Sequence, residues 1–566
     1  MDIYFSWVDY SLLILMLILS AVIGVYYGFF KSQSSAKEYL LGGKKMAVWP
    51  IALSLISSTM SGLPLVVFPV EIYYFGIQFI LGIFLVIIAT LFTYYFYIPV
   101  FYKLQLTSTY EYLKLRFDNK IRILASIFYT IYMLLYLPVV IFVPALALAQ
   151  VTGINIYLIT PITCGVCIFY TTLGGMKAVV WTDSLQFVVM IGSMMIIAIV
   201  GIIAAGGLPF IMKTLYETNR LDFDFDLDPR LRTTFWNSSI GNLFFICSLI
   251  CINQSTIQKC LSLSTFKKVK QALIIFGTGM TVLVAFICIC GMTMFGRYYD
   301  CDPLKSGKIK KPDQLLPYYI MDVGRNIPGL PGLFVSGILS AGLSTLSAAM
   351  NCLAATMYED FIKPFMKKDI SERKESFILK LLVLFIGLIS TALVFAVEHL
   401  GSLFPLVISF MSVAGAPLLG LFTIGMLIPM VNSKGALCGG TASLIIMAWI
   451  TIGGYIHRSK YPYIPLPLST NSCINNTITK LTQSVPDQES EDGFFLYTIS
   501  HNYYSMIAVM IVIVVSVIVS YFTKDKETVV NKDYISPVAH FLLSGKDNEN
   551  SYHDVDKALT IVMERS

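Results

Sequence analysis

Apolar runs, each long enough for a helix to cross a membrane, recur along nearly the whole chain. A membrane-crossing helix needs about 20 mostly apolar residues, and thirteen segments of the 566-residue chain meet this requirement. They are residues 8–30, 46–70, 77–101, 121–147, 157–176, 178–205, 238–258, 272–296, 326–354, 377–398, 403–430, 435–456 and 503–522. The pattern predicts an all-α, multi-span membrane protein with thirteen transmembrane helices, and the lipid bilayer is therefore its first partner.

The composition agrees with this prediction. Hydrophobic residues make up 56% of the chain and charged residues only 13%, whereas soluble domains carry about 25% charged residues. The first ten residues hold two acids and no basic residue, so they lack the basic n-region of a cleavable signal peptide. We therefore expect the first span to be retained. Most of the 11 cysteines fall inside apolar runs, where they serve as small packing residues.

The distribution of Lys and Arg predicts the orientation. With the N-terminus outside, 27 of the 40 Lys and Arg residues fall on the cytosolic side, so we expect an outside N-terminus and a cytosolic C-terminus in a plasma-membrane protein. The glycosylation signals at Asn237 and Asn475 fall in loops assigned outside, whereas a third signal, at Asn253, lies within a span and is discarded. Cys301 and Cys473 are also assigned outside, where a disulfide between them is permitted but not required.

The second span combines a polar face with a break. Four serines between positions 54 and 61 recur at helical spacing and share one face, and Gly62 and Pro64 then interrupt the helix. Pro64 has no N–H, so the carbonyl of Met60 loses its hydrogen-bond partner. In lipid a freed carbonyl must be satisfied by protein, water or an ion. A hard cation suits this position; a plain proline kink, with serines bonding back to the helix, is the alternative.

The ninth span carries a continuous polar stripe. Ser340, Ser344, Ser347 and Asn351 are spaced four, three and four residues apart, with Thr345 at the edge of the stripe. The many Gly and Ala neighbours allow close approach of another helix. Two serine-rich faces and one unsatisfied carbonyl together predict a sodium site built from oxygen atoms alone. A packing seam without an ion is the alternative.

The sixth and seventh spans also carry polar residues. Asp183 lies about five residues inside the sixth span, with Gln186 on the same face, and we interpret the two as a cation relay on the cytosolic side; a helix N-cap is the alternative for Asp183. Asn253 and Gln254 lie well along the seventh span and indicate a second discontinuous helix. The two interrupted spans are each the first of five, which predicts a five-plus-five inverted repeat with its binding site near the midplane.

The expected organisation has five parts. They are residues 1–45, an N-terminal span and cytosolic loop; 46–205, the first inverted repeat; 206–430, the second inverted repeat with outside loops; 431–522, two C-terminal spans with a glycosylated outside loop; and 523–566, a cytosolic tail. The tail is polar, mixed in charge and weakly patterned, so we expect a flexible segment rather than a domain.

Several stretches resemble signatures of the sodium/solute symporter family, and the resemblance runs from about Asp9 to Tyr521. The stretches most typical of the family are GGMKAVVWTDSLQ at 174–186 and PGLPGLFVSGILSAGLST at 328–345. Those most similar to its iodide, multivitamin and monocarboxylate branch are VPALALAQVTG at 143–153 and YEDFIKP at 358–364. Thirteen spans without a fourteenth also fit that branch. The resemblance implies a fold of the leucine-transporter type.

The resemblance also implies a sodium site and a cytosolic acid. The sodium ligands of the family correspond here to the carbonyls of Ser57, Met60 and Ala341 and to the hydroxyls of Ser344 and Thr345. The carbonyl of Met60 is the one that the following proline frees, so the two lines of reasoning converge. The cytosolic acid of the family corresponds to the aspartate already identified in the sixth span.

The solute pocket of the family is lined by residues of the broken helices. The implied contacts in this chain are Thr59, Ser61, Pro64, Asn253, Gln254 and, by match to a pocket tyrosine of the iodide-like branch, Tyr136. Pro64 departs from the family pattern, because that position is often a polar residue facing the solute. Its apolar ring would suit a solute with an apolar body.

These observations predict a sodium-coupled secondary active symporter that imports a small organic anion, either a monocarboxylate or a vitamin-like carboxylate, by alternating access. Sodium is the co-substrate, and no cofactor or nucleic-acid partner is expected. The alternatives are a solute sensor or channel on the same fold, or a symporter for a neutral solute such as a sugar. An enzyme is not expected, because the five histidines lie at span ends or in loops and the sequence has no metal-ligand cluster, nucleophile motif or phosphate-binding loop. The sequence leaves the oligomeric state open.

Overall fold

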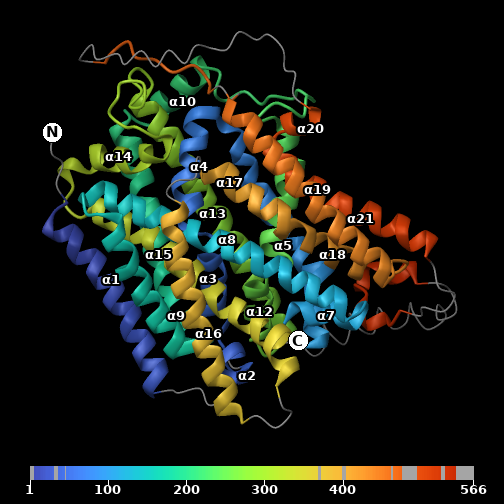
Figure 1. The fold of residues 1–566 in the computed structure, drawn as a ribbon. Helices are drawn as coiled ribbons and strands as arrows, with labels where there is room; N and C mark the ends of the chain where they lie inside the picture. The colour runs from blue at the N-terminus through green and yellow to red at the C-terminus, as the bar shows by residue number, and fades with distance from the viewer. Residues whose placement is uncertain are drawn as a thin grey trace.

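The structure, a computed structural model, describes residues 5–30, 36–44, 46–106, 108–366, 371–397, 403–460, 463, 465–473, 494–523 and 530–543. Within these ranges every regular element is a helix and no strand occurs. The prediction of an all-α protein is therefore confirmed. Figure 1 shows the long helices packed side by side, with short connecting helices gathered at the two ends of the molecule.

The helices follow one another along the whole described chain. They are α1 (Trp7–Val25), α2 (Ala36–Leu41), α3 (Val48–Thr59), α4 (Gly62–Phe75), α5 (Gly82–Phe92), α6 (Ile98–Leu104), α7 (Thr109–Arg116), α8 (Asn119–Thr152), α9 (Ile156–Ala204), α10 (Leu208–Glu217), α11 (Asn242–Ile250), α12 (Gln254–Leu261), α13 (Phe266–Tyr298), α14 (Leu315–Val323), α15 (Leu330–Met357), α16 (Glu372–Val397), α17 (Leu403–Phe410), α18 (Ala416–Leu427), α19 (Ser433–Lys460), α20 (Phe495–Thr498) and α21 (Tyr504–Phe522). Among the described residues, five short π-helical segments extend these helices: η1 (Tyr26–Phe30) after α1, η4 (Thr93–Tyr97) between α5 and α6, η5 (Asn237–Gly241) before α11, η8 (Tyr358–Ile362) after α15, and η10 (Met411–Gly415) between α17 and α18.

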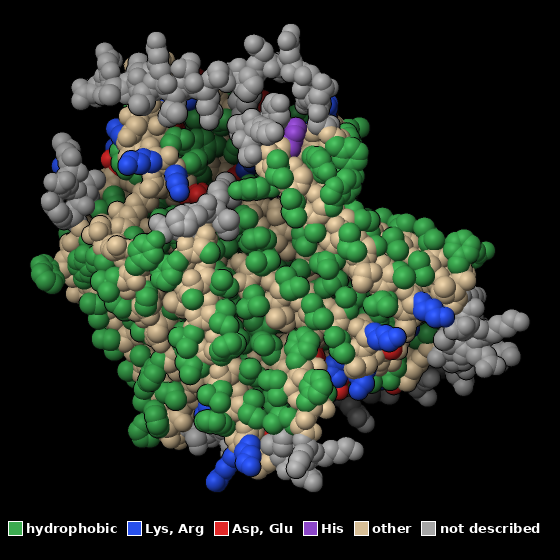
Figure 2. All heavy atoms as spheres, viewed as in Figure 1, with side chains coloured by type: hydrophobic (Ala, Val, Ile, Leu, Met, Phe, Trp, Pro, Cys, Tyr) green, Lys and Arg blue, Asp and Glu red, His purple; other side chains and the backbone are tan. Residues whose placement is uncertain are grey.

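The surface is that of a membrane protein. Figure 2 shows hydrophobic side chains over the middle of the visible face, with most Lys and Arg side chains toward its ends. Among the described residues, ten helical stretches are long and apolar enough to cross a membrane, and the two bent pairs α3–α4 and α11–α12 raise the number to twelve. Multiple membrane-crossing helices were predicted and are confirmed; the count of thirteen is not.

The difference from thirteen comes from α9, which counts once although two spans were predicted over its length. A helix of 49 residues would be about 74 Å long, more than twice the hydrocarbon thickness of about 30 Å. Its backbone is interrupted at Gly175, where φ is 54° and ψ is −154°, a conformation that favours glycine. A division at this residue would supply the thirteenth span, which stays a prediction.

Both predicted helix breaks are present. The axes of α3 and α4 differ by 57°, and those of α11 and α12 by 50°. Met60 ends α3 in an extended conformation, with φ −92° and ψ 98°, and Asn253 precedes α12 with φ −61° and ψ 126°. The side chain of Asn253 caps α12 by accepting a hydrogen bond of 2.9 Å from the N–H of Ser255. Both discontinuous helices are therefore confirmed.

The serine-rich helix α15 lies at the centre of the bundle. Its most apolar stretch is 94% buried, and it packs against α1, α8, α9 and α16. Two of its glycines make this possible: a Cβ at Gly337 would lie 2.1 Å from Ser193 Oγ on α9, and one at Gly342 would lie 2.6 Å from Cγ of Pro144 on α8. Small residues thus bring the polar stripe of α15 close to its neighbours.

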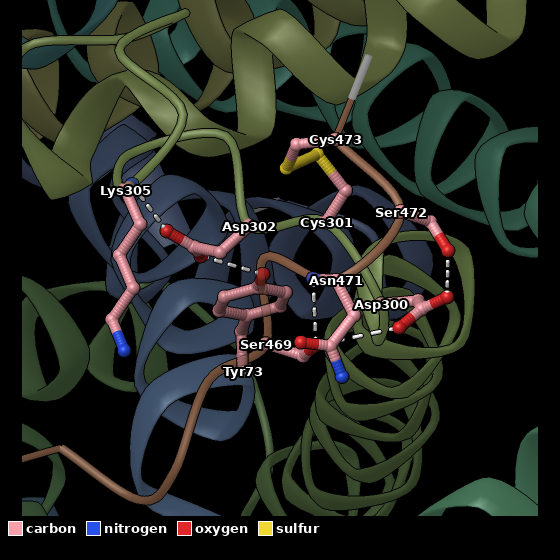
Figure 3. The surroundings of a disulfide bond; sticks show 9 residues. All are labelled: Tyr73, Asp300, Cys301, Asp302, Lys305, Ser469, Asn471, Ser472 and Cys473. Atoms are coloured by element: carbon pink, nitrogen blue, oxygen red, sulfur yellow. Dashed lines mark hydrogen bonds between the residues drawn. A yellow bond between two sulfur atoms is a disulfide. The ribbon is translucent and has the colours of Figure 1, made fainter. Parts of the chain in front are cut away.

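The loops at one end are tied together by a disulfide. Cys301 and Cys473 are bonded, with their Cα atoms 5.2 Å apart, so the pairing that the sequence left open is made. Figure 3 shows the two loops around it, in which Ser469 donates a hydrogen bond of 3.3 Å to Asp300. The Oη of Tyr73 on α4 donates to the neighbouring Asp302 at 2.7 Å.

Asn237 was predicted to carry a glycan, but its side chain is fully buried and its Nδ2 donates to the carbonyls of Leu231 at 3.0 Å and Arg232 at 3.3 Å. The amide nitrogen is thus held inside the loop in this conformation, and glycosylation at Asn237 stays a prediction. Asn475 lies outside the described residues.

Candidate functional site for a cation and a solute

The break between α3 and α4 leaves backbone oxygen atoms without helical partners. The last regular hydrogen bond of α3 runs from the N–H of Met60 to the carbonyl of Ile56, at 3.0 Å. The residue four positions after Met60 is Pro64, which has no N–H to donate to the Met60 carbonyl. Ser57 is fully buried on the last turn of α3, and no described residue offers its Oγ a hydrogen-bond partner. The break therefore presents oxygen atoms that need a partner.

Helix α15 approaches the same turn. Thr345 Oγ1 donates to the carbonyl of Ala341 at 3.0 Å and to the carbonyl of Ser58 on α3 at 3.2 Å. The structure thus brings the two segments that carry the predicted sodium ligands into contact. Their oxygen atoms are neutral hydroxyls and carbonyls, the type of ligand that a hard cation prefers.

Ser344, another predicted sodium ligand, has its hydroxyl directed at an acid. Its Oγ donates to Oδ1 of Asp183 at 2.7 Å, and Ser54 on α3 donates to Oδ2 at 2.6 Å. Asp183 is fully buried, so it is not an N-cap at the membrane interface. It connects α9 to both helices of the predicted sodium site.

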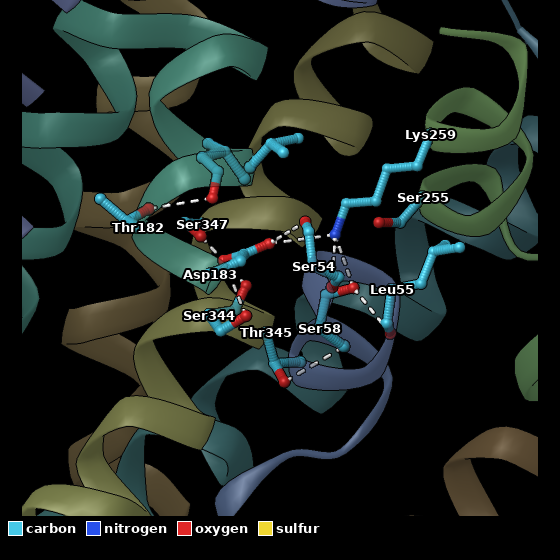
Figure 4. Close-up of polar contacts among 12 residues, drawn as sticks. Ser54, Leu55, Ser58, Thr182, Asp183, Ser255, Lys259, Ser344, Thr345 and Ser347 are labelled. Carbon is cyan, nitrogen blue, oxygen red and sulfur yellow. Dashed lines mark hydrogen bonds and ion pairs between the residues drawn. The ribbon is translucent and has the colours of Figure 1, made fainter. Parts of the chain in front are cut away.

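A lysine completes this cluster, as Figure 4 shows. Nζ of Lys259, on α12, lies 3.0 Å from Oδ2 of Asp183, and it also donates to the carbonyl of Ser54 at 3.0 Å and to Oγ of Ser58 at 2.6 Å. The side chains of Lys259 and Asp183 are 1% and 0% exposed. The seventh span was predicted to end at residue 258, so Lys259 was expected just outside it, whereas the structure buries this lysine within α12.

Gln186, predicted to act with Asp183, points elsewhere. Its Nε2 lies 3.5 Å from the hydroxyl of Ser20 on α1, whereas Asp183 contacts α3, α12 and α15. Both residues lie on α9 three positions apart, as predicted. Because α9 packs between α1 and α15, however, their side chains contact different helices.

A large cavity opens beside the break. It holds about 1140 Å³ of free space, solvent at its mouth included. Three of the predicted solute contacts, Thr59, Pro64 and Tyr136, line it. Most of the remaining wall is apolar, and the described lining contains no charged side chain. Its far wall is formed by α13, through residues such as Val284.

A second, smaller chamber adjoins the cavity. The two share Thr59, Leu249 and the stacked rings of Tyr132 and Tyr136, whose centroids lie 5.4 Å apart. The lining of the small chamber is more polar: it includes the predicted solute contact Asn253 together with Ser58, Ser255, Thr256 and Thr345. The small chamber therefore borders the residues of the predicted sodium site.

Two predicted solute contacts line neither space. Ser61 lies next to the shared wall, where its Oγ accepts a hydrogen bond of 3.3 Å from Tyr136. Gln254 is buried, and its Oε1 accepts a hydrogen bond of 2.8 Å from the backbone N–H of Thr109 on α7. In this conformation Gln254 joins α12 to α7 instead of facing the cavity.

Sequence reasoning missed Lys259 and the aromatic wall of the cavity. Lys259 follows Gln258 near the end of α12 and precedes a run of three further lysines, so its charge was assigned to the loop. The signal that could have found it is its isolation, because seven residues without a basic side chain separate Lys259 from Lys267. Phe68 and Phe79, which line the cavity, carry no signal that distinguishes them from other apolar residues of their spans.

The comparisons with known proteins agree with one another. The family model described as the sodium:solute symporter family matches residues 39–442. The chain is 39% identical over 518 residues to sodium-coupled monocarboxylate transporter 2 of Bos taurus, covering 91% of this chain and 84% of that protein. It is 36% identical over 554 residues to sodium-coupled monocarboxylate transporter 1 of Homo sapiens, covering 94% and 90%. It is 35% identical over 516 residues to a putative sodium-dependent multivitamin transporter of Drosophila melanogaster, covering 89% and 85%.

Solved structures show the same fold at lower identity. A substrate-bound, outward-open Na⁺-coupled sialic acid symporter superposes with a TM-score of 0.74 at 22% identity, covering 92% of this chain and 98% of that one. The closed form of Mhp1, a nucleobase-cation-symport-1 family transporter, superposes with a TM-score of 0.54 at 10% identity, covering 87% and 96%. These likenesses concern the fold, and they agree with the predicted leucine-transporter type.

Proposed function

The chain belongs to the sodium:solute symporter family, a family of transporters and not of enzymes, and we propose that it imports a monocarboxylate whose apolar body lies in the large cavity. Sodium-coupled symport of a small organic solute, as the sequence predicted, follows from the membership. The choice of a monocarboxylate rests on one observation: a large apolar cavity adjoins a small polar chamber.

An amphipathic anion fits these two spaces. Apolar walls favour a hydrocarbon body, because each CH₂ removed from water contributes about 0.8 kcal/mol. The small chamber offers neutral donors from Asn253 and Thr256, and Ser58 on its wall receives a hydrogen bond from the ammonium group of Lys259. Because Asp183 balances the charge of Lys259, the preference for a carboxylate rests on these neutral donors and on a sodium ion bound beside them. A sugar would need hydrogen-bonding partners on every side, which the described wall of the large cavity offers at few positions.

For sodium, we propose the carbonyls of Ser57, Met60 and Ala341 and the hydroxyls of Ser344 and Thr345. The contact of Thr345 with α3 and the missing partner of the Met60 carbonyl support this set. Sodium bound there would lie beside the small chamber, where it would add to the positive potential on the carboxylate.

Asp183 would then take part in sodium release, as a relay toward the cytosol. Its direct bond to Ser344 supports this role, because a carboxylate that holds one sodium ligand is placed to receive the ion next. Lys259 shares the same carboxylate, so the ammonium group would compete with a departing sodium ion for it. Gln186 has no comparable contact with the site.

The orientation that we propose has the N-terminus outside and the C-terminus in the cytosol, in the plasma membrane. The excess of Lys and Arg in the loops assigned to the cytosol supports it. Epitope tags at the two termini of the protein in intact cells test it, since an externally accessible C-terminus would contradict the orientation. Removal of the signal at Asn475 should also reduce the glycan mass of the protein.

Radiotracer uptake tests the solute. Cells that express the protein are assayed with monocarboxylates of two to ten carbons, with sodium and with choline in its place. We expect sodium-dependent, saturable uptake whose KM falls about fourfold for each added CH₂ until the cavity is filled. A sensor or channel would instead give solute-gated current without concentrative uptake. Competition by sugars but not by carboxylates would reject the monocarboxylate proposal.

A matched pair of variants tests the cavity itself. Val284→Phe adds volume to the cavity wall formed by α13, whereas Val282→Phe adds the same volume on a side chain that is 40% exposed. We expect Val284→Phe to raise KM for a six-carbon acid at least tenfold more than for a three-carbon acid, and Val282→Phe to change neither. Equal effects of both variants would show that the solute body lies elsewhere.

A further inference from the structure

Fourteen described residues beyond the last span lie against the helical bundle. After α21, residues 530–543, here called the C-terminal latch, pack back onto the helical bundle as the short 3-10 segments η12 (Lys532–Tyr534) and η13 (Pro537–Leu542). The latch lies at the same end of the molecule as α7 (Figure 1). The prediction of a flexible tail was therefore wrong for these fourteen residues.

The latch is bound through its backbone as well as its side chains. Tyr112 on α7 donates from its Oη to the carbonyl of Tyr534 at 2.9 Å. The N–H of Ser536 donates to the carbonyl of Met426, at the end of α18, at 2.9 Å. Lys103 on α6 forms an ion pair of 2.6 Å with Asp533. The latch therefore contacts the consecutive helices α6 and α7 and also α18, which lies far from them in the sequence.

The packing of the latch is selective. Ile535 and Ala539, four residues apart, are 2% and 4% exposed, whereas Val538 is 44% and Phe541 is 76% exposed. A segment that had merely collapsed onto an apolar surface would bury its largest apolar side chains. Here one face is buried and the other is left free, as in a peptide bound to a formed site.

The helices that hold the latch are connected to the second broken helix. Thr109, the first residue of α7, donates its N–H to Gln254 at the start of α12. At the other end of α7, Arg116 donates to the carbonyls of Gly425, Pro429 and Val431 at 3.0–3.1 Å. Helix α7 is thus fixed between α12, the end of α18 and the latch.

From these contacts we infer that residues 530–543 bind to the bundle as an internal ligand and close the α7 end of the transporter. Alternating access moves one group of helices against another around a site that discontinuous helices such as α12 form, so α12 and its neighbours change their relative positions during the cycle. Movement of α12 away from the bundle pulls on α7 through Gln254, and the latch resists that movement by holding α7 and α18 together. Release of the latch lowers the resistance to opening at this end. This inference concerns the conformational cycle and does not depend on which solute is carried.

Hydrogen–deuterium exchange of the purified protein tests the binding. Two truncations form a matched pair: a chain ended after Thr528 lacks the latch, and a chain ended after Leu543 keeps it. Ile535→Asp and Val538→Asp form a second pair, because the same charge is placed on the buried and the exposed face. We expect at least tenfold faster exchange over residues 98–116 in the Thr528 truncation and in Ile535→Asp. The Leu543 truncation and Val538→Asp should exchange like the full chain.

A synthetic peptide of residues 530–543 completes the test. Added to the Thr528 truncation, it should restore slow exchange over residues 98–116, whereas the peptide with Ile535→Asp should not. Equal exchange in the two truncations, or no effect of the unmodified peptide, would overturn the binding. If the latch also resists opening of the α7 end, initial uptake should rise at least twofold in the Thr528 truncation at equal surface expression. Faster exchange with unchanged uptake would refute the restraint while leaving the binding intact.

Discussion

Removal of the ammonium group of Lys259 should expose how strongly the central polar cluster depends on its ion pair. The lysine and Asp183 are 1% and 0% exposed and lie 3.0 Å apart. Breaking a buried ion pair by removing one partner costs about 3–5 kcal/mol, because the other charge is left buried without compensation. We therefore expect Lys259→Met and Asp183→Asn each to destabilise the folded protein by about this amount.

The double variant carries the decisive measurement. Asp183→Asn combined with Lys259→Met leaves no unpaired charge, so its loss of stability should be smaller than the sum of the single losses by at least about 2 kcal/mol. Stability is measured as the fraction of monodisperse protein after heating in detergent, with urea titration for the free-energy scale. Lys268→Met, on an exposed lysine of the next helix, is the control and should be neutral.

Two outcomes would refute the reasoning. If the two single losses add up in the double variant, the ion pair contributes no coupling and the cluster is held by its hydrogen bonds alone. If the double variant is stable and carries sodium-driven uptake at the rate of the unmodified protein, Asp183 is not a cation relay. A stable double variant with slow turnover and unchanged solute affinity would instead support the relay.

The remaining predictions concern three other places in the fold. Ser344→Ala with Thr345→Ala should raise the sodium concentration for half-maximal uptake at least tenfold, with surface expression retained; an unchanged sodium dependence would remove both from the site. Ser347→Ala, on the same helix, should have a smaller effect because its hydroxyl bonds back within the helix at 3.0 Å. Cys301→Ala should lower the free energy of unfolding by about 2–5 kcal/mol, and an unlowered melting temperature would contradict this. Burial, together with the nearby Glu71, raises the pKa of Asp313 from 3.8 to about 6. The folded state therefore loses stability as the pH rises from 3.8 to about 6, and this loss is complete above 6. Asp313→Asn should accordingly raise the melting temperature at pH 7.5 more than at pH 5.

The sequence by itself determined the membrane-crossing architecture and the places where it is interrupted. Length and apolarity identify a membrane-crossing helix without any partner, because lipid takes the place of a protein core. Pro64 cannot donate a hydrogen bond to the carbonyl of Met60, so a continuous helix is disfavoured there, and the spacing of Ser340, Ser344 and Ser347 defines one face of any helix. These are local properties, and for that reason the break after Met60 and the contact of α15 with α3 appear where they were expected.

Only the tertiary structure decided which polar groups meet. Lys259 and Asp183 are 76 residues apart, and nothing in either segment shows that α12 directs a lysine at α9. Asn237 carries a valid glycosylation signal, yet it is buried because its amide satisfies the carbonyls of a neighbouring turn. Residues 530–543 lie in a tail that is polar and weakly patterned as a whole, and they are ordered by contacts with α6, α7 and α18 together. Periodicity reports the faces of one helix, whereas a buried charge, an enclosed amide and a docked tail each depend on residues that only the folded chain brings into contact.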